Sequence, residues 1–75
     1  MSRSLSTIAR EIEGSWPKVN YAARPYLDAM RELESIDDMY YYDTAKSVVL
    51  YFLSNAGSFR GEDAKRLKAE LKALL

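Results

Sequence analysis

The chain has 75 residues, enough for one small domain spanning residues 1–75. It contains neither cysteine nor histidine, which excludes disulfide bonds, Ser-His-Asp hydrolysis and zinc sites built from cysteine and histidine. The basic and acidic residues number eleven each and give a formal net charge of zero, which disfavours a globally basic nucleic-acid binder. We therefore expect a protein that is not an enzyme and needs no cofactor.

The first predicted helix covers residues 4–13. Its apolar residues recur at helical spacing: Leu5, Ile8, Ala9 and Ile12. Either Ser4 or Ser6 can cap its start, and Gly14, which a proline soon follows, is expected to end it. Trp16 comes directly after this stop, and we expect its ring to fold back over the edge of the core.

The second predicted helix covers residues 20–36, with Asn20 as a plausible cap. One stripe contains its apolar residues: Ala22, Tyr26, Ala29, Met30, Leu33 and Ile36. Pro25 is tolerated only in the first turn of a helix. Either the regular helix begins near Arg24 or a preliminary turn precedes a kink, and we expect an irregular first turn over residues 20–23.

The third predicted helix is the most apolar segment, and Gly57 is a natural residue to follow its end. Asp43 is a good N-cap, and residues 44–56 follow it. The inner seam of this helix is predicted to consist of Ala45, Val49, Phe52 and Ala56. Val48 and Leu53 lie beside the seam, and Leu50 widens the apolar surface. A helix this apolar is expected to be the central one.

The last segment, residues 59–75, is predicted to be an amphipathic helix with Glu62 and Arg66 as a favourable ion pair. Its seam has Ala64, Leu67, Leu71 and Leu74. Together the four segments predict an all-α fold, a small compact bundle of three to four helices.

Three carboxylates flank the link between the second and third helices: Asp37, Asp38 and Asp43. Calcium and magnesium prefer such oxygen ligands, but tyrosines occupy the alternate positions of the segment and the central glycine of a calcium-binding loop is missing. We therefore expect no metal site. Asp37 and Asp38 are instead expected to end the second helix in solvent.

Three consecutive tyrosines lie in the same link: Tyr40, Tyr41 and Tyr42. Bulky residues in a short turn cannot all point inward, so one or two should cover the helix ends while the rest lie exposed. They either form a lid over the core or make contact with a partner, since tyrosine is enriched at binding hot spots. The candidate partner-binding residues are Asp37, Asp38, Tyr40, Tyr41 and Tyr42.

The C-terminal segment is basic, whereas residues 28–43 are acidic. The basic residues form an alternative, nucleic-acid-binding set: Arg60, Lys65, Arg66, Lys68 and Lys72. Solvated charged faces are common on helices, which weakens this alternative. The acidic and basic parts could also pair between molecules and support a homo-oligomer.

Charged residues interrupt residues 1–14 too often for this segment to contain the apolar stretch of a signal sequence. The longest apolar run, residues 48–53, is far too short to span a bilayer. We therefore expect a cytoplasmic protein without membrane association.

Three stretches carry a resemblance to a known family: VNYAARPYLDAM, YYYDTAKSVVLYFLSNAGSFRG and DAKRLKAELKALL. The chain resembles very small proteins encoded in bacteriophage and prophage genomes, over residues 5–71. In that family an aromatic residue precedes an Arg-Gly pair, as Phe59 does here, and a basic helix follows. The chain departs from the family at Tyr41, where a glycine often interrupts the tyrosine run.

The resemblance implies a context, although no functional residue is carried over from the family. Small phage proteins without catalytic groups often bind a host or phage protein, and inhibitors of bacterial immunity such as anti-CRISPR proteins are one kind. Our leading hypothesis is a non-enzymatic protein that modulates or inhibits a protein partner through its acidic, tyrosine-rich surface. The alternative is a small nucleic-acid-binding regulator that uses the basic C-terminal helix.

Overall fold

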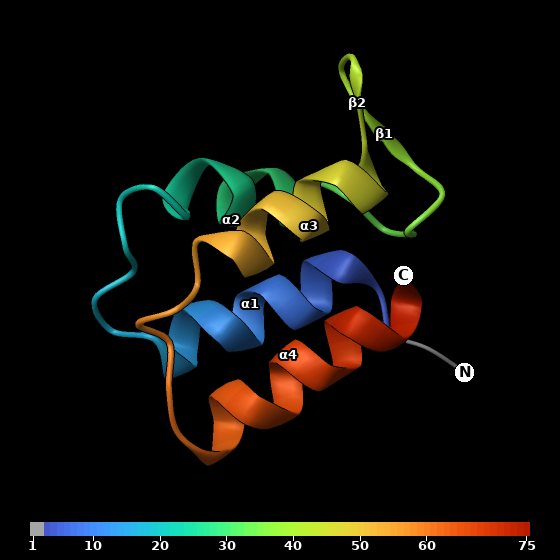
Figure 1. Cartoon of the computed structure of the whole chain (residues 1–75). Coiled ribbons are helices and arrows are strands. Elements are labelled where there is room, and N and C mark those ends of the chain that lie inside the picture. Colours follow the sequence, from blue (N-terminus) through green and yellow to red (C-terminus); the bar gives the residue numbers. More distant parts are fainter. Residues whose placement is uncertain (1–2) are drawn as a thin grey trace.

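The computed structural model describes residues 3–75, which form four helices and one short hairpin (Figure 1). The elements in chain order are α1 (Leu5–Ser15), α2 (Arg24–Met30), β1 (Met39–Tyr40), β2 (Asp43–Thr44), α3 (Ala45–Ser54) and α4 (Glu62–Leu74). The two strands are antiparallel, with Met39 opposite Thr44 and Tyr40 opposite Asp43. The predicted helical character is confirmed, but an all-α class misses this two-stranded sheet.

Helix α1 lies in the middle of the fold, with α4 on one side and α2 and α3 on the other (Figure 1). Ser4 caps it, because Thr7 donates its backbone N–H to the Ser4 hydroxyl at 3.2 Å. Its apolar residues at helical spacing are fully buried: Leu5, Ile8, Ala9 and Ile12. The prediction that α3 would be central is therefore wrong; its outer face leaves Leu50 and Tyr51 exposed.

Trp16 closes one end of the core, as the sequence predicted. Its ring is 5 % exposed, stacks on Phe59 with centroids 5.0 Å apart, and meets Phe52 edge-on at 6.1 Å. The helix before it continues through Gly14 to Ser15, beyond the predicted end. Glycine lowers the stability of a helix, but it does not prevent the backbone from being helical.

Helix α2 is shorter than predicted and ends at Met30 instead of Ile36. The expected irregular turn is present, since Ala23 and Arg24 both donate their amides to the Asn20 carbonyl, and Pro25 then lies in the first turn of the helix. Beyond the helix, the carbonyls of residues 33 and 34 accept the amides of Ser6 and Leu5 at 2.8 and 3.0 Å. They thereby satisfy N–H groups at the start of α1 that have no partner within that helix.

Asp38 shapes the loop after α2, so the prediction that it ends a helix in solvent is wrong. The amides of Glu34 and Ser35 both donate to its carboxylate at 3.0 Å. In a continued helix these amides would bond to carbonyls four residues earlier. The Asp38 carbonyl in turn accepts the amide of Ala45 at 2.9 Å, which joins the loop to the start of α3.

The N-cap of α3 is Thr44, not Asp43. The Thr44 hydroxyl accepts the amide of Ser47 at 3.1 Å, and its backbone is extended. Asp43 is instead paired with Tyr40 across the hairpin. The predicted inner seam is confirmed, because its four members are all buried: Ala45, Val49, Phe52 and Ala56.

Helix α4 packs its predicted seam against the core. Ala64, Leu67 and Leu71 are buried and Leu74 is half-buried. The helix starts at Glu62 rather than at residue 59, because the backbone of Gly61 lies outside the helical region. Gly61 provides the N-cap with φ at +112°, a conformation that favours glycine.

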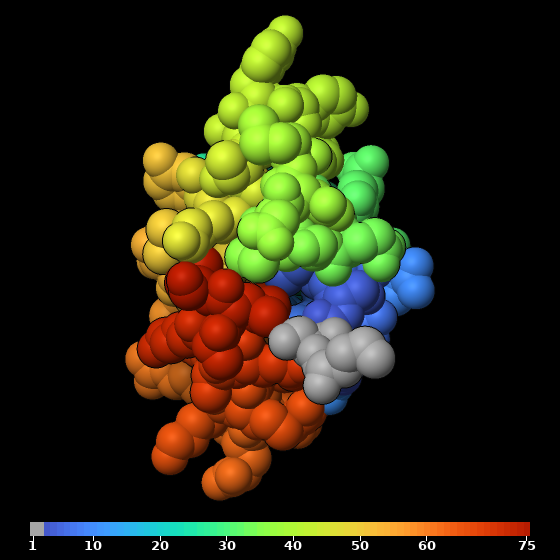
Figure 2. All heavy atoms as spheres, turned by 90° about the vertical axis from the view of Figure 1, so that its right-hand side faces the viewer, coloured from blue at the N-terminus to red at the C-terminus, as the bar shows by residue number. Residues whose placement is uncertain are grey.

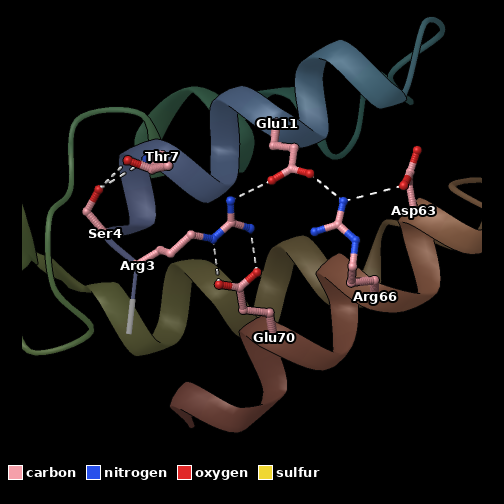
Figure 3. Close-up of polar contacts among 7 residues, drawn as sticks. All are labelled: Arg3, Ser4, Thr7, Glu11, Asp63, Arg66 and Glu70. Atoms are coloured by element: carbon pink, nitrogen blue, oxygen red, sulfur yellow. Dashed lines mark hydrogen bonds and ion pairs between the residues drawn. The ribbon is translucent and has the colours of Figure 1, made fainter. Parts of the chain in front are cut away.

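Ion pairs join the N-terminal segment, α1 and α4 (Figure 3). Arg3 donates to Glu70 at 2.5 and 2.8 Å and to Glu11 at 2.6 Å, and Arg66 donates to Glu11 and Asp63. The predicted pairing of Arg66 with Glu62 is therefore replaced by a contact with Glu11 on α1 and a local contact with Asp63. Hydrogen bonds from Arg66 and then Arg3 lower the pKa of Glu11, and the bond from Arg3 lowers the pKa of Glu70.

These lowered pKa values predict an acid-sensitive contribution to stability. It is fully present above the unfolded-state pKa, about 4.3 for glutamate, and is lost as the pH falls through the lower folded-state values. We expect Glu11→Gln to be less stable than wild type at neutral pH and to lose less unfolding free energy between about pH 6 and about pH 3. Urea unfolding at a series of pH values measures both effects.

A matched control is Asp37→Asn, which changes an exposed loop carboxylate outside the network. This variant should have an unfolding free energy close to that of the wild type at neutral pH. About 0.5 M NaCl should reduce the difference in unfolding free energy between Glu11→Gln and the wild type, because exposed ion pairs are screened by salt. If the unfolding free energies of Glu11→Gln and the wild type had the same pH dependence, the ion-pair network would not contribute to stability.

Candidate protein-interaction surface

The tyrosine run forms the tip of the hairpin, which stands out from the body of the molecule (Figures 1 and 2). Tyr41 and Tyr42 are the two residues between the paired positions Tyr40 and Asp43. Tyr41 has φ at +56°, and it is the only residue other than glycine with positive φ among residues 3–75. Two-residue hairpin turns require positive φ at their first central position, where glycine is preferred.

The three tyrosines have different environments. Tyr40 is half-buried and packs against the core. Tyr41 and Tyr42 are 80 % and 97 % exposed, and Met39 on the same hairpin is 58 % exposed. The expectation that some tyrosines cover the core while others lie exposed is therefore confirmed, with one ring inward and two outward.

A groove lies beside the hairpin, with a volume of about 510 Å³. Within it the rings of Tyr26 from α2 and Tyr51 from α3 stack, with centroids 5.5 Å apart and planes at 28°. We call it the tyrosine groove, and its lining residues are Pro25, Tyr26, Ala29, Tyr40, Asp43, Val48 and Tyr51. The tyrosine groove and the exposed hairpin residues Met39, Tyr41 and Tyr42 together form the tyrosine surface.

Tyr40 joins the hairpin to the groove. Its hydroxyl donates to the Glu32 carboxylate at 3.3 Å, and its ring is nearly perpendicular to that of Tyr41, with centroids 4.8 Å apart. Burial raises the pKa of Tyr40, and the nearby charge of Glu32 raises it further. Tyr40 is therefore a neutral hydrogen-bond donor with a fixed orientation, and its ring forms a wall of the groove.

The predicted partner-binding residues do not all belong to this surface. Asp37 is exposed in the loop before the hairpin, and the carboxylate of Asp38 is taken up by the amides of that loop. Sequence reasoning also missed Tyr51 and assigned Tyr26 to the core stripe alone. The spacing of Tyr51 three residues after Val48 places both on one helical face, but only the packing of α2 beside α3 brings Tyr26 to it.

Most of the predicted basic residues gather at the start and along one face of α4. Arg60, Lys65 and Lys68 line a shallow groove of about 330 Å³ together with Phe59, Gly61 and Ala64. Lys68 donates to the Phe59 carbonyl at 2.6 Å and lies 5.7 Å from the Phe59 ring centre. Burial lowers the pKa of Lys68, and the charges of Lys72 and Arg60 lower it further.

Arg66 does not join this basic set. Its guanidinium is turned toward α1, where it pairs with Glu11, and it also contacts Asp63 (Figure 3). The candidate nucleic-acid surface is therefore reduced to four side chains: Arg60, Lys65, Lys68 and Lys72. We call these four the basic face.

Two further classes of feature can be stated for residues 3–75. No three acidic side chains in this range come together in an arrangement that could hold a metal ion. None of the helices in the same range has the length and apolar character needed to cross a membrane.

The comparisons with family models, with curated proteins and with solved structures found no match to this chain.

The positive φ of Tyr41 predicts an unusual response to glycine. Tyr41→Gly and Tyr41→Ala both remove the ring, but only glycine adopts this backbone without strain, so Tyr41→Gly should be more stable by about 1 kcal/mol. At position 42, where φ is not positive, the order should reverse, with Tyr42→Gly less stable than Tyr42→Ala by about 0.5–1 kcal/mol. Chemical denaturation of the four variants measures both differences.

The comparison within each position cancels the loss of the side chain, including the contact between Tyr41 and Tyr40. If alanine and glycine gave the same order at positions 41 and 42, the hairpin turn would differ from the one described.

Proposed function

We propose that this chain is a non-enzymatic interaction protein that binds a protein partner through its tyrosine surface. The supporting observation is the exposure of Tyr41 and Tyr42 at the tip of a hairpin that stands out from the body. Exposed aromatic side chains lose apolar hydration when a partner covers them, and they provide large contact area at low entropic cost. A side chain in a strained backbone conformation at such a position is also typical of a functional site.

The groove extends this surface from the hairpin onto the helices. Tyr51 is 54 % exposed at the groove, and the stacked ring of Tyr26 supports it from α2. Because the rings are held by helices and by the bond from Tyr40 to Glu32, they need little ordering on binding, which favours affinity. The hairpin and the groove are therefore proposed to act as one contact surface.

The resemblance to phage-encoded proteins supports a proposal for the class of partner. We propose a bacterial or phage protein in the host cytoplasm, with a component of bacterial immunity as one such partner, whose action the chain modulates or inhibits. A second copy of the chain is the other protein that could cover the tyrosine surface, and size-exclusion chromatography with light scattering separates this case.

The double variant Tyr42→Ala/Tyr51→Ala tests the proposed surface. A partner captured from a bacterial lysate by the wild-type chain should bind the variant at least about tenfold more weakly, because truncated hot-spot aromatics typically cost about 2 kcal/mol or more each. Affinity is measured with the purified partner, and circular dichroism confirms that the helices remain.

The matched control is Tyr21→Ala, which removes an equally large exposed ring from the turn before α2. This turn lies at the far side of the molecule from the hairpin (Figure 1). The control should bind like wild type. Equal affinities for the wild type and the double variant would contradict the proposal.

The basic face supports a second candidate function, nucleic-acid binding. Arg60, Lys65 and Lys68 share one shallow groove, and Lys72 is near enough to Lys68 to affect its pKa. Such a cluster can neutralise several phosphates and release their counterions. With Arg66 paired to Glu11, only four cations are available, so we rank this candidate second.

A duplex titration at increasing salt tests the second candidate. If the basic face binds phosphate, Lys65→Gln/Lys72→Gln should weaken binding and reduce the slope of log affinity against log salt by about two, roughly one for each lost contact. Lys46→Gln, which changes an exposed lysine on α3, serves as the control and should leave the slope unchanged. No complex with wild type at low salt would eliminate nucleic-acid binding.

A further inference from the structure

The inner surface of the tyrosine groove combines aromatic rings with aliphatic groups. Tyr26 and Tyr51 stack side by side, and Tyr40 forms another wall. Pro25, Ala29 and Val48 complete the apolar lining, and among residues 3–75 no lysine or arginine lines the groove. Aromatic faces carry a negative electrostatic potential, so a groove of this kind attracts cations as well as apolar groups.

The charges around the groove are predominantly negative. Asp43 belongs to the lining, and Glu32 holds the hydroxyl of Tyr40. Neither carboxylate forms an ion pair with any residue in the range 3–75. Asp43 is therefore available to a ligand in the groove, and Glu32 lies at the hydroxyl of Tyr40, which forms one wall of the groove.

The basic residues of the neighbouring helix do not neutralise these two carboxylates. Arg24 pairs with Glu13 at 3.2 Å and with Asp28 at 3.3 Å, and Arg31 pairs with Glu13 at 3.3 Å. Two arginines and two other acids thus balance each other beside α2. The charges of Glu32 and Asp43 remain in excess at the groove.

We propose that the tyrosine groove binds a lysine or arginine side chain from a partner protein, with its aliphatic stem against the rings and its charged end at Glu32 and Asp43. This inference rests on the proposed function and names the chemistry of the partner segment. A cation over tyrosine faces gains from the ring quadrupoles, and its charge also complements the two carboxylates. An anionic side chain would be repelled by them, and a purely apolar one would leave them without a counter-charge.

The exposed hairpin residues fit this arrangement. The rings of Tyr41 and Tyr40 pack edge to face, so the hairpin tip continues directly from the wall of the groove. Residues flanking the bound lysine or arginine can then lie against Tyr41 and Tyr42. The basic side chain provides charge complementarity in the groove, while the flanking contacts add apolar area.

Blocked tripeptides test the chemistry of the groove without knowledge of the natural partner. The probes are acetyl-Gly-Lys-Gly-amide, acetyl-Gly-Arg-Gly-amide and the uncharged analogue that has norleucine in the centre. Ring resonances of Tyr26, Tyr40 and Tyr51 are followed by NMR in full-length protein labelled at tyrosine. We expect saturable shifts with the two cationic peptides, at roughly millimolar affinity, and at most about a third of that affinity with norleucine.

Matched variants locate the binding to the groove. Glu32→Gln/Asp43→Asn preserves side-chain size and the acceptor for Tyr40, and should weaken the cationic peptides about three- to tenfold. Tyr51→Ala should abolish the saturable shifts, whereas Asp37→Asn should leave the affinity unchanged. The inference is overturned if norleucine binds equally well, if no peptide shifts the rings, or if Glu32→Gln/Asp43→Asn binds like wild type.

Failure of this inference and failure of the proposed function give different results. If the cationic peptides do not bind but Tyr42→Ala/Tyr51→Ala still loses the partner, the surface binds a protein by other chemistry. If the double variant retains the partner while the peptides bind the groove, the groove recognises cations but the proposed interaction lies elsewhere.

Discussion

The carboxylate of Asp38 is the constraint on which the arrangement of the tyrosine surface depends. By accepting the amides of Glu34 and Ser35, it turns the chain out of the helical path after α2. The carbonyls of this turned segment satisfy the first amides of α1, and the Asp38 carbonyl holds the start of α3. Asp38 thereby connects the loop after α2 to the start of α3, beside the point where the hairpin leaves the body.

The surface that results has two regions of opposite character. The tyrosine surface carries aromatic rings and Asp43, with Glu32 bound to Tyr40 beside them, whereas the basic face carries Arg60 and three lysines. The net charge of zero thus hides a separation of charge across a small molecule. Such a separation orients the chain as it approaches a charged partner, and it favours encounters in one direction over others.

Local sequence patterns predicted most of the helices and much of the core. Helical spacing identified the buried residues of α1, α3 and α4, and the restriction on Pro25 placed the irregular turn before α2. The same patterns misplaced the caps and ends near the hairpin. Asp43 and Thr44 are both good N-caps and both are paired across the hairpin, but it is the Thr44 hydroxyl that accepts the amide of Ser47.

The sequence by itself determined the class of chemistry open to this chain and the faces of its helices, because composition and spacing act locally. It excluded cysteine and histidine chemistry and marked the tyrosine run as a candidate surface. Only the tertiary structure decided which residues share that surface. Asp38 was turned inward to backbone amides, Arg66 was drawn to Glu11, and Tyr26 and Tyr51 met across two helices. These contacts join residues distant along the chain, and their geometry depends on the packing of the whole core.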